Sequence, residues 1–341
     1  MGIVGRFVRT WIVGRLLKRN PIVLVLLWLV NRVRRGLRTA REVPLSTLRA
    51  RGRVGANFLE RRGLVDDRAP PPNGEIDDLD AFARSSGGPS DEDDGFDPAS
   101  VDERVRDFSE RTAAYRLAYR VRWGRGFRLG ARLAARVTSR IEQLNLPGRS
   151  VGWRRLHSRF VAVDLPDDPR DDVRGWVRTD DDGDCVFLAL YGSHTHDTDG
   201  HGSAERFVNI AVPLPGCTLS TVLRPRNVGP SEMDSAERSR LGRVIRPVSR
   251  FTARLDRFAS GPVSRDEAES ESVGDGIEWT TAGGGHPGLY LRLPGTAYRL
   301  PIGQRFLVAP AGPDDSAKLR AVHEMRVVGV RFLRIDYRME R

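Results

Sequence analysis

The sequence predicts an α+β protein, in which a helical, basic N-terminal half is followed by an antiparallel β-rich half of sandwich or barrel-like form. In residues 3–17 and 101–144, apolar residues recur mostly at three- and four-residue steps, which is typical of helices. After residue 150, short apolar runs and alternating stretches are separated by Gly and Pro, which is typical of strands. The charge also changes, because 1–63 carries net +13 and 101–160 net +10, whereas 161–341 carries net −3. This asymmetry indicates an anionic partner for the first half, either lipid headgroups or nucleic-acid phosphate.

The composition is that of a globular protein with some unstructured segments: 341 residues, 39% hydrophobic and 30% charged. It excludes a collagen, a disulfide scaffold (there are only two cysteines) and a polytopic membrane protein. Among 56 basic residues only Lys18 and Lys318 are lysines. The arginine excess and the Asp-rich stretches resemble the composition of halophilic archaeal proteins, although a net charge of +11 departs from their acidic character.

Residues 1–63 are predicted to form a basic, amphipathic membrane-interface segment. Apolar residues up to Leu17 recur at helical spacing among arginines, and after Pro21 nine apolar residues run from Ile22 to Val30. Nine are too few for a spanning helix, which needs about 20, and arginines rather than a small-residue cleavage site follow them. The side chains expected at the interface are Phe7, Trp11, Ile12, Ile22, Leu24, Leu27 and Trp28. The alternatives are a short re-entrant hairpin, helices packed on the protein or a partner, and a nucleic-acid-binding arm.

The next two segments are predicted to be a linker and a long helix. Residues 64–100 are acidic and rich in Pro and Gly, which favours a disordered linker. Residues 101–147 are predicted to form an Arg-rich amphipathic helix, or two helices divided near Gly124, Gly126 and Gly130. This helical segment is expected either to cover a sheet or to offer a second surface for lipid or phosphate. The arginines expected to bind anions are Arg32, Arg34, Arg35 and Arg38 beside the apolar run, and Arg125, Arg128, Arg132 and Arg136 in the helix.

The C-terminal half is predicted to hold two β modules separated by an insert. The first module, 148–229, contains the apolar runs Cys185–Tyr191 and Phe207–Val212. Residues 230–288 are expected to form a helical insert followed by an acidic, Gly-rich loop. The second module, 289–341, ends in a stretch where apolar and charged residues alternate, as in a strand with one buried face. One sheet system interrupted by the insert is the alternative.

A histidine cluster is the strongest candidate for metal chemistry. His194, His196, Asp199 and His201 follow an apolar strand, and this density of imidazole and carboxylate could hold Zn²⁺ or another divalent ion. The run resembles the His-x-His-x-Asp-His motif of the metallo-β-lactamase family, although Asp199 and His201 are not adjacent. The alternative is a polar hairpin loop. No phosphate-binding loop, dinucleotide fingerprint, nucleophile elbow or Cys-x-x-Cys is present.

These patterns favour a non-enzymatic structural or interaction protein, held at an anionic membrane surface by its basic N-terminal region. The expected partners are anionic lipids and either other proteins or further copies of the chain, with the β-rich half making the protein contacts. Such a protein suits the cytoplasmic face of a membrane, a cell-envelope complex or the membrane-facing layer of a virion. The alternatives are a nucleic-acid-contacting structural protein and a metal-dependent hydrolase centred on His194–His201.

Overall fold

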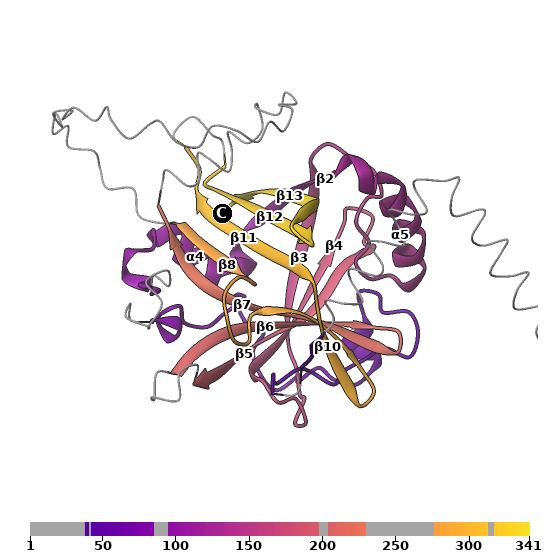
Figure 1. Cartoon of the computed structure of the whole chain (residues 1–341), viewed down its shortest axis with the longest axis horizontal. Helices are drawn as coiled ribbons and strands as arrows, with labels where there is room; N and C mark the ends of the chain where they lie inside the picture. The colour runs from indigo at the N-terminus through magenta and orange to yellow at the C-terminus, as the bar shows by residue number, and fades with distance from the viewer. Residues whose placement is uncertain (1–37, 41, 85–94, 198–203, 230–275, 313–316) are drawn as a thin grey trace, which may run out of the picture.

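The structure is a computed structural model that describes residues 38–40, 42–84, 95–197, 204–229, 276–312 and 317–341. Antiparallel strands dominate these residues (Figure 1). The strands are β1 (Arg38–Thr39), β2 (Arg116–Trp123), β3 (Arg154–Ala162), β4 (Asp171–Thr179), β5 (Cys185–Asp197), β6 (Ala204–Leu214), β7 (Cys217–Val228), β8 (Gly276–Thr280), β9 (Gly288–Leu293), β10 (Thr296–Leu300), β11 (Ile302–Pro310), β12 (Leu319–Val327) and β13 (Val330–Glu340). The α-helices are α3 (Phe58–Arg61), α4 (Glu103–Glu110) and α5 (Arg128–Ile141), and the 3-10 helices are Asp80–Phe82, Pro98–Ser100, Thr112–Ala114 and Arg125–Phe127.

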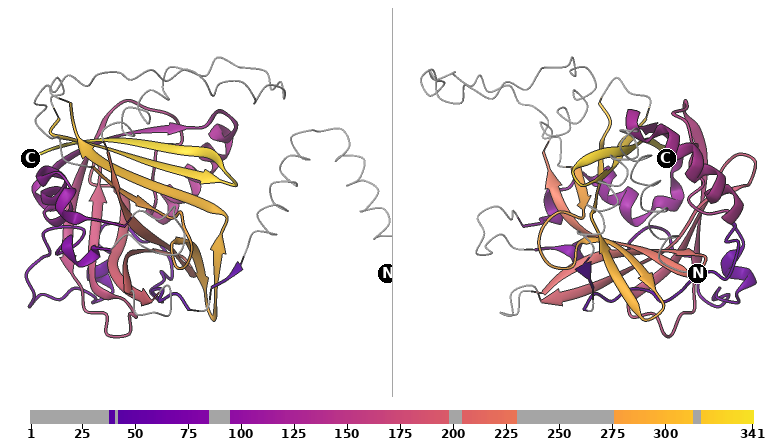
Figure 2. Two further views of the ribbon diagram at one scale, coloured as in Figure 1. Left: turned by 60° about the vertical axis from the view of Figure 1, so that its left-hand side comes forward. Right: turned by 45° about the vertical axis from the view of Figure 1, so that its right-hand side comes forward.

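Ten of these strands close into a barrel, in the order β7-β6-β5-β4-β3-β2-β13-β12-β11-β8. The ring closes because β8 pairs with β11 on one side and with β7 on the other. β7 divides its pairing: Thr218–Val222 pairs with β9, and Arg224–Val228 pairs with β8. Figure 2 shows the yellow C-terminal strands and the pink central strands wrapped into one sheet. Strands from the two predicted β modules therefore form a single barrel.

Side chains alternate between the barrel interior and its outer surface, as the period of a strand requires. In β13, Leu333, Ile335, Tyr337 and Met339 are buried in the largest core cluster. The predicted alternation of this strand is confirmed, and so is the antiparallel β-rich character of the C-terminal half. The helical character predicted for the N-terminal half is not supported as a whole, because the described residues before 148 hold strands β1 and β2 beside helices α3, α4 and α5.

The predicted helix over residues 101–147 is wrong in its middle. α4 and α5 lie within it, but Arg116–Trp123 forms β2, between β13 and β3. The reason is that Tyr115, Tyr119 and Trp123 are four residues apart, and a four-residue step is compatible with both one face of a helix and one face of a strand. Between them Leu117 and Val121 are also buried, which completes the two-residue period of a strand.

The predicted disordered linker at 64–100 is wrong for its described residues. Ile76, Leu79, Phe82 and Phe96 are buried in the main core cluster, in spite of the acidic residues around them. These apolar side chains supply the burial that offsets the entropy cost of ordering the segment. Residues 85–94, which include the most acidic run, lie outside the described residues.

The described part of the predicted membrane-interface segment packs on the barrel instead. Between residues 42 and 63, the side chains of Leu45, Val54, Phe58 and Leu59 are buried in two small clusters on the outer side of the sheet. The predicted interface residues Phe7 to Trp28, and Arg32, Arg34 and Arg35, lie outside the described residues, while Arg38 begins β1. In the predicted insert, Gly276–Thr280 forms β8 rather than a loop, and 230–275 is outside the described residues.

Candidate functional site

The barrel encloses an apolar cavity of about 310 Å³. Inward-facing side chains of the ring strands form most of its wall, because every second residue of each strand points inward. The apolar part of the wall includes Leu156, Val186, Val208, Ile210, Val212, Leu219, Leu223, Phe306, Leu333 and Ile335. A volume of this size lies at the lower end of the range for small-molecule sites, which are typically apolar with a few placed polar groups.

The polar groups of the cavity include one strong cation, Arg178 of β4. This side chain is nine-tenths buried, and its guanidinium carbon lies 3.6 Å from the centroid of the Trp176 ring. The ring of Tyr337 is 5.8 Å away. Arg178 forms no ion pair with a described residue, and its Nε has no hydrogen-bond partner, while another part of the guanidinium hydrogen-bonds to Tyr337. A buried cation in this state is costly, and a nearby anion would offset much of the cost.

Glu75, Tyr191 and His323 also line the cavity. Burial raises the pKa of Glu75 to about 7, although the positive charge of Arg178 acts in the opposite direction. Burial lowers the pKa of His323 to about 4, so this imidazole is neutral at neutral pH. Burial also raises the pKa of Tyr191 well above its ordinary value. Near neutral pH, therefore, Arg178 is the one permanent charge among these four groups.

Helix α5 separates the cavity from solvent on one side of the molecule. Ala131, Ala135 and Thr138 are one helical face, at i, i+4 and i+7, and they line the cavity. The opposite face carries large apolar side chains that remain exposed: Leu129 is 70%, Leu133 54% and Val137 58% exposed. Among the described residues, the other exposed large apolar side chains are Val330, at 58%, and Leu293, at 39%. Isolated exposed leucines are ordinary, but a stripe on one helix is not.

Arginines surround this exposed stripe. Arg125, in the 3-10 turn before α5, and Arg128, Arg132 and Arg136 of α5 are the predicted anion-binding residues, and Arg140 joins them. All five are exposed, none forms an ion pair with a described residue, and no acidic residue lies between Arg125 and Ile141. Positive charge in the first turn opposes the helix dipole, so this arrangement does not serve helix stability. We call Leu129, Leu133, Val137 and these five arginines the α5 face.

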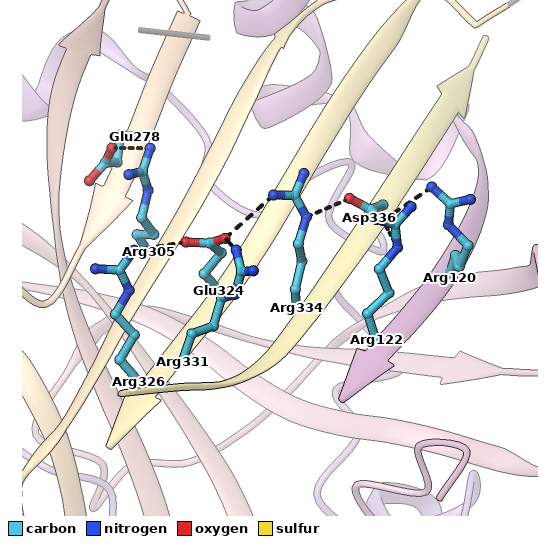
Figure 3. Close-up of polar contacts among 9 residues, drawn as sticks. All are labelled: Arg120, Arg122, Glu278, Arg305, Glu324, Arg326, Arg331, Arg334 and Asp336. Carbon is cyan, nitrogen blue, oxygen red and sulfur yellow. Dashed lines mark hydrogen bonds and ion pairs between the residues drawn. The ribbon is translucent and has the colours of Figure 1, made fainter. Parts of the chain in front are cut away.

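The arginines on the outer surface of β2 and β11–β13 are arranged differently, because they are paired (Figure 3). Asp336 is buried and accepts from Arg334 at 2.8 Å, Arg122 at 3.1 Å and Arg120 at 3.3 Å. Glu324 is contacted by Arg331 at 2.6 Å, by Arg326 at 3.3 Å and by Arg334 at 3.4 Å. Glu278 forms an ion pair with Arg305 at 3.2 Å. These arginines are paired with carboxylates on the sheet surface, whereas the arginines of the α5 face form no ion pair with a described residue.

The predicted metal residues are only partly described. His194 and His196 lie near the end of β5, but Asp199 and His201 are outside the described residues. The structure brings His286 to them instead: His194 Nε2 is 3.0 Å from His286 Nδ1, and the His196 and His286 ring centroids are 3.7 Å apart. Burial, first of all, lowers the pKa of His194 to about 3 and that of His286 to about 4. The described residues contain no group of three or more His, Cys, Asp or Glu placed to hold a metal ion.

Sequence reasoning missed the cavity residues. Glu75 lies in the segment predicted to be a linker, and Arg178 precedes an Asp-rich turn, so neither carries a local motif. His286 is 92 residues from His194 and meets it only through the sheet. The signal that the sequence does carry is the apolar neighbours of these residues. Glu75 is next to Ile76, and Arg178 follows Trp176 and Val177 in a run of strand length.

Comparison with known proteins gives one distant relative. No protein-family profile and no solved structure matches the chain. The uncharacterized membrane protein YndJ of Bacillus subtilis (strain 168) is 24% identical over 242 residues, which is 71% of this chain and 35% of YndJ. The chain thus matches about a third of that protein's length. Among the described residues of this chain, no helix is long and apolar enough to cross a membrane.

Proposed function

We propose that this protein is a non-enzymatic component of an anionic membrane surface, to which it docks through the α5 face. The observation that carries the proposal is the exposed stripe of Leu129, Leu133 and Val137 within a cluster of unpaired arginines. An amphipathic helix with leucines on one side and arginines beside them suits the boundary between headgroups and acyl chains. The barrel then remains available for contacts with a protein partner or another copy of the chain.

The combination of surfaces favours lipid over nucleic acid. Phosphate contacts would use the arginines alone and would leave three large apolar side chains in water. At a bilayer both parts are used, because the apolar side chains enter the interface while the guanidinium groups stay at headgroup level. The similarity to a membrane protein, YndJ, supports the same choice.

The expected loss of vesicle binding follows from the positive charges of the α5 face. Each arginine near an anionic surface contributes about 1 kcal/mol at physiological ionic strength. Replacing Arg128, Arg132 and Arg136 by Gln is therefore expected to weaken vesicle binding by about 3 kcal/mol, or roughly 100-fold. The matched control replaces three exposed arginines elsewhere, Arg51, Arg62 and Arg68.

Flotation of the full-length protein with phosphatidylcholine vesicles, with and without phosphatidylserine, tests the proposal. We expect binding only to the anionic vesicles, strong weakening in the α5 triple variant, and near-wild-type binding of the control. Leu133→Ser should also weaken binding, whereas Val330→Ser, an equally exposed apolar residue on β13, should not. Equal flotation of the α5 variants and their controls would refute docking through α5. Binding of duplex DNA but not of vesicles would favour the nucleic-acid alternative.

A further inference from the structure

We propose that the barrel cavity binds a single-chain amphiphilic carboxylate, with its carboxylate beside Arg178 and its hydrocarbon chain along the apolar wall. This site is separate from the α5 face, and its occupation requires no membrane. The proposal goes beyond the membrane association proposed above and can fail independently of it.

The size of the cavity limits the ligand. Liquid water occupies about 30 Å³ per molecule, so about 310 Å³ has room for roughly ten groups the size of water or a methylene. That capacity suits one medium-length chain and excludes a lipid with two long chains. The wall around it is hydrocarbon, with Val208, Leu223 and Ile335 on three different strands.

The positive charge of Arg178 favours a ligand with an anionic headgroup. Arg178 is buried, lines the cavity and forms no ion pair with a described residue. Its guanidinium hydrogen-bonds to Tyr337, but its Nε lacks a hydrogen-bond partner. Guanidinium binds carboxylate with two parallel hydrogen bonds when space allows. Trp176 stacks on the guanidinium and fixes its plane, so the donors are oriented before a ligand arrives.

Glu75 makes this binding dependent on pH. Arg178 of β4, Tyr191 of β5 and Tyr337 of β13 are the groups that act electrostatically on or with this carboxyl group. Both tyrosines are neutral in the range considered, because burial raises their pKa values. A second carboxylate entering beside Arg178 would repel ionised Glu75, so binding is accompanied by proton uptake at Glu75. Affinity should therefore increase as the pH falls from 8 to 6.

The test uses the full-length protein in vesicle-free buffer, with calorimetry on decanoate, 1-decanol and decyltrimethylammonium at concentrations below micelle formation. We expect decanoate to bind at least tenfold more tightly than decanol, and the cationic amphiphile to bind weakest. Arg178→Met should remove the preference for decanoate while leaving decanol binding. The matched control is Arg155→Met, an exposed arginine on the neighbouring strand β3, which should leave both affinities unchanged.

A second variant keeps the test valid if Arg178→Met does not fold. Ala135→Trp places a large ring into the cavity from α5 without changing the α5 face, and it should abolish binding of both decanoate and decanol. The proposal is overturned if the wild-type protein binds none of the amphiphiles, if it binds decanoate and decanol equally, or if Ala135→Trp leaves binding intact. Loss of vesicle flotation with intact decanoate binding would overturn only the membrane proposal.

Discussion

Replacing Glu75 by Gln is expected to stabilise the protein above neutral pH and to leave its stability unchanged near pH 4. The carboxyl group lines the cavity, where burial raises its pKa from 4.5 to about 7. The folded protein therefore holds a proton on Glu75 at pH values where the unfolded chain has released it. Gln has nearly the same shape as the protonated acid but carries no charge to bury.

The sign and size of this stability difference follow from linkage between folding and protonation. Below pH 4.5 Glu75 is protonated in both the folded and the unfolded protein, so it does not lower the free energy of unfolding. As pH rises from 4.5 to 7 the unfolded chain ionises first, so the contribution of Glu75 to the free energy of unfolding falls, and above 7 it stays at its lowest value. One pKa unit corresponds to about 1.4 kcal/mol, so the whole difference is about 3 kcal/mol.

Urea unfolding followed by tryptophan fluorescence between pH 4 and 8 measures this difference, since Trp176 and Trp279 are buried. His323 in the same cavity titrates with the opposite sign, because its pKa is lowered to about 4, so its contribution is lost as pH falls. Subtracting wild type from variant at each pH removes that contribution. Glu340→Gln, at the exposed end of β13, serves as control. A difference that does not grow with pH would refute the reasoning about Glu75.

Three further substitutions test the fold around the site. Asp336→Asn leaves Arg334 and Arg122 around a neutral amide, and we expect a loss of about 3 kcal/mol in urea unfolding at pH 7. These arginines hold the pKa of Asp336 below its ordinary 3.8, so the deficit should disappear as the pH falls below that value. Gly74→Ala puts a Cβ into the backbone of Glu110 and should cost about 2 kcal/mol, whereas Gly126→Ala, in open space, should not. Gln143→Leu removes the buried amide that donates to the Leu188 carbonyl at 2.8 Å and accepts from its N–H at 2.9 Å, and a loss of about 2 kcal/mol is expected by thermal or urea unfolding.

The sequence predicts the strands that have an unambiguous local pattern. The apolar run Cys185–Tyr191 lies in β5, and the alternation at the end of the chain is β13. Closure of the barrel could not be predicted, because it depends on β8 pairing with β7 across about 50 residues of intervening chain, and no local pattern records such a pairing. β2 was missed because its aromatic residues are spaced by four, which fits two kinds of element.

The two candidate sites differ in how far the sequence predicts them. Arg125, Arg128, Arg132 and Arg136 are recognisable from the density of arginine alone, and the structure adds that they are exposed and that leucines lie beside them. The cavity depends on tertiary packing, which brings Glu75 from the segment before α4 and Arg178 from β4 into one apolar enclosure. Residues of that kind become visible only when the fold is known.

A fluorophore on α5 tests the docking of this helix most directly. In a Cys217→Ser background, which leaves only the buried Cys185, Leu133→Cys can carry an environment-sensitive dye on the α5 face. We predict a blue shift, and quenching by lipid-borne quenchers, with vesicles that contain phosphatidylserine and not with phosphatidylcholine alone. The same dye attached at Val330→Cys should show the emission of an aqueous environment with both kinds of vesicle. Vesicle binding without a spectral change at position 133, or with an equal change at position 330, would contradict the account.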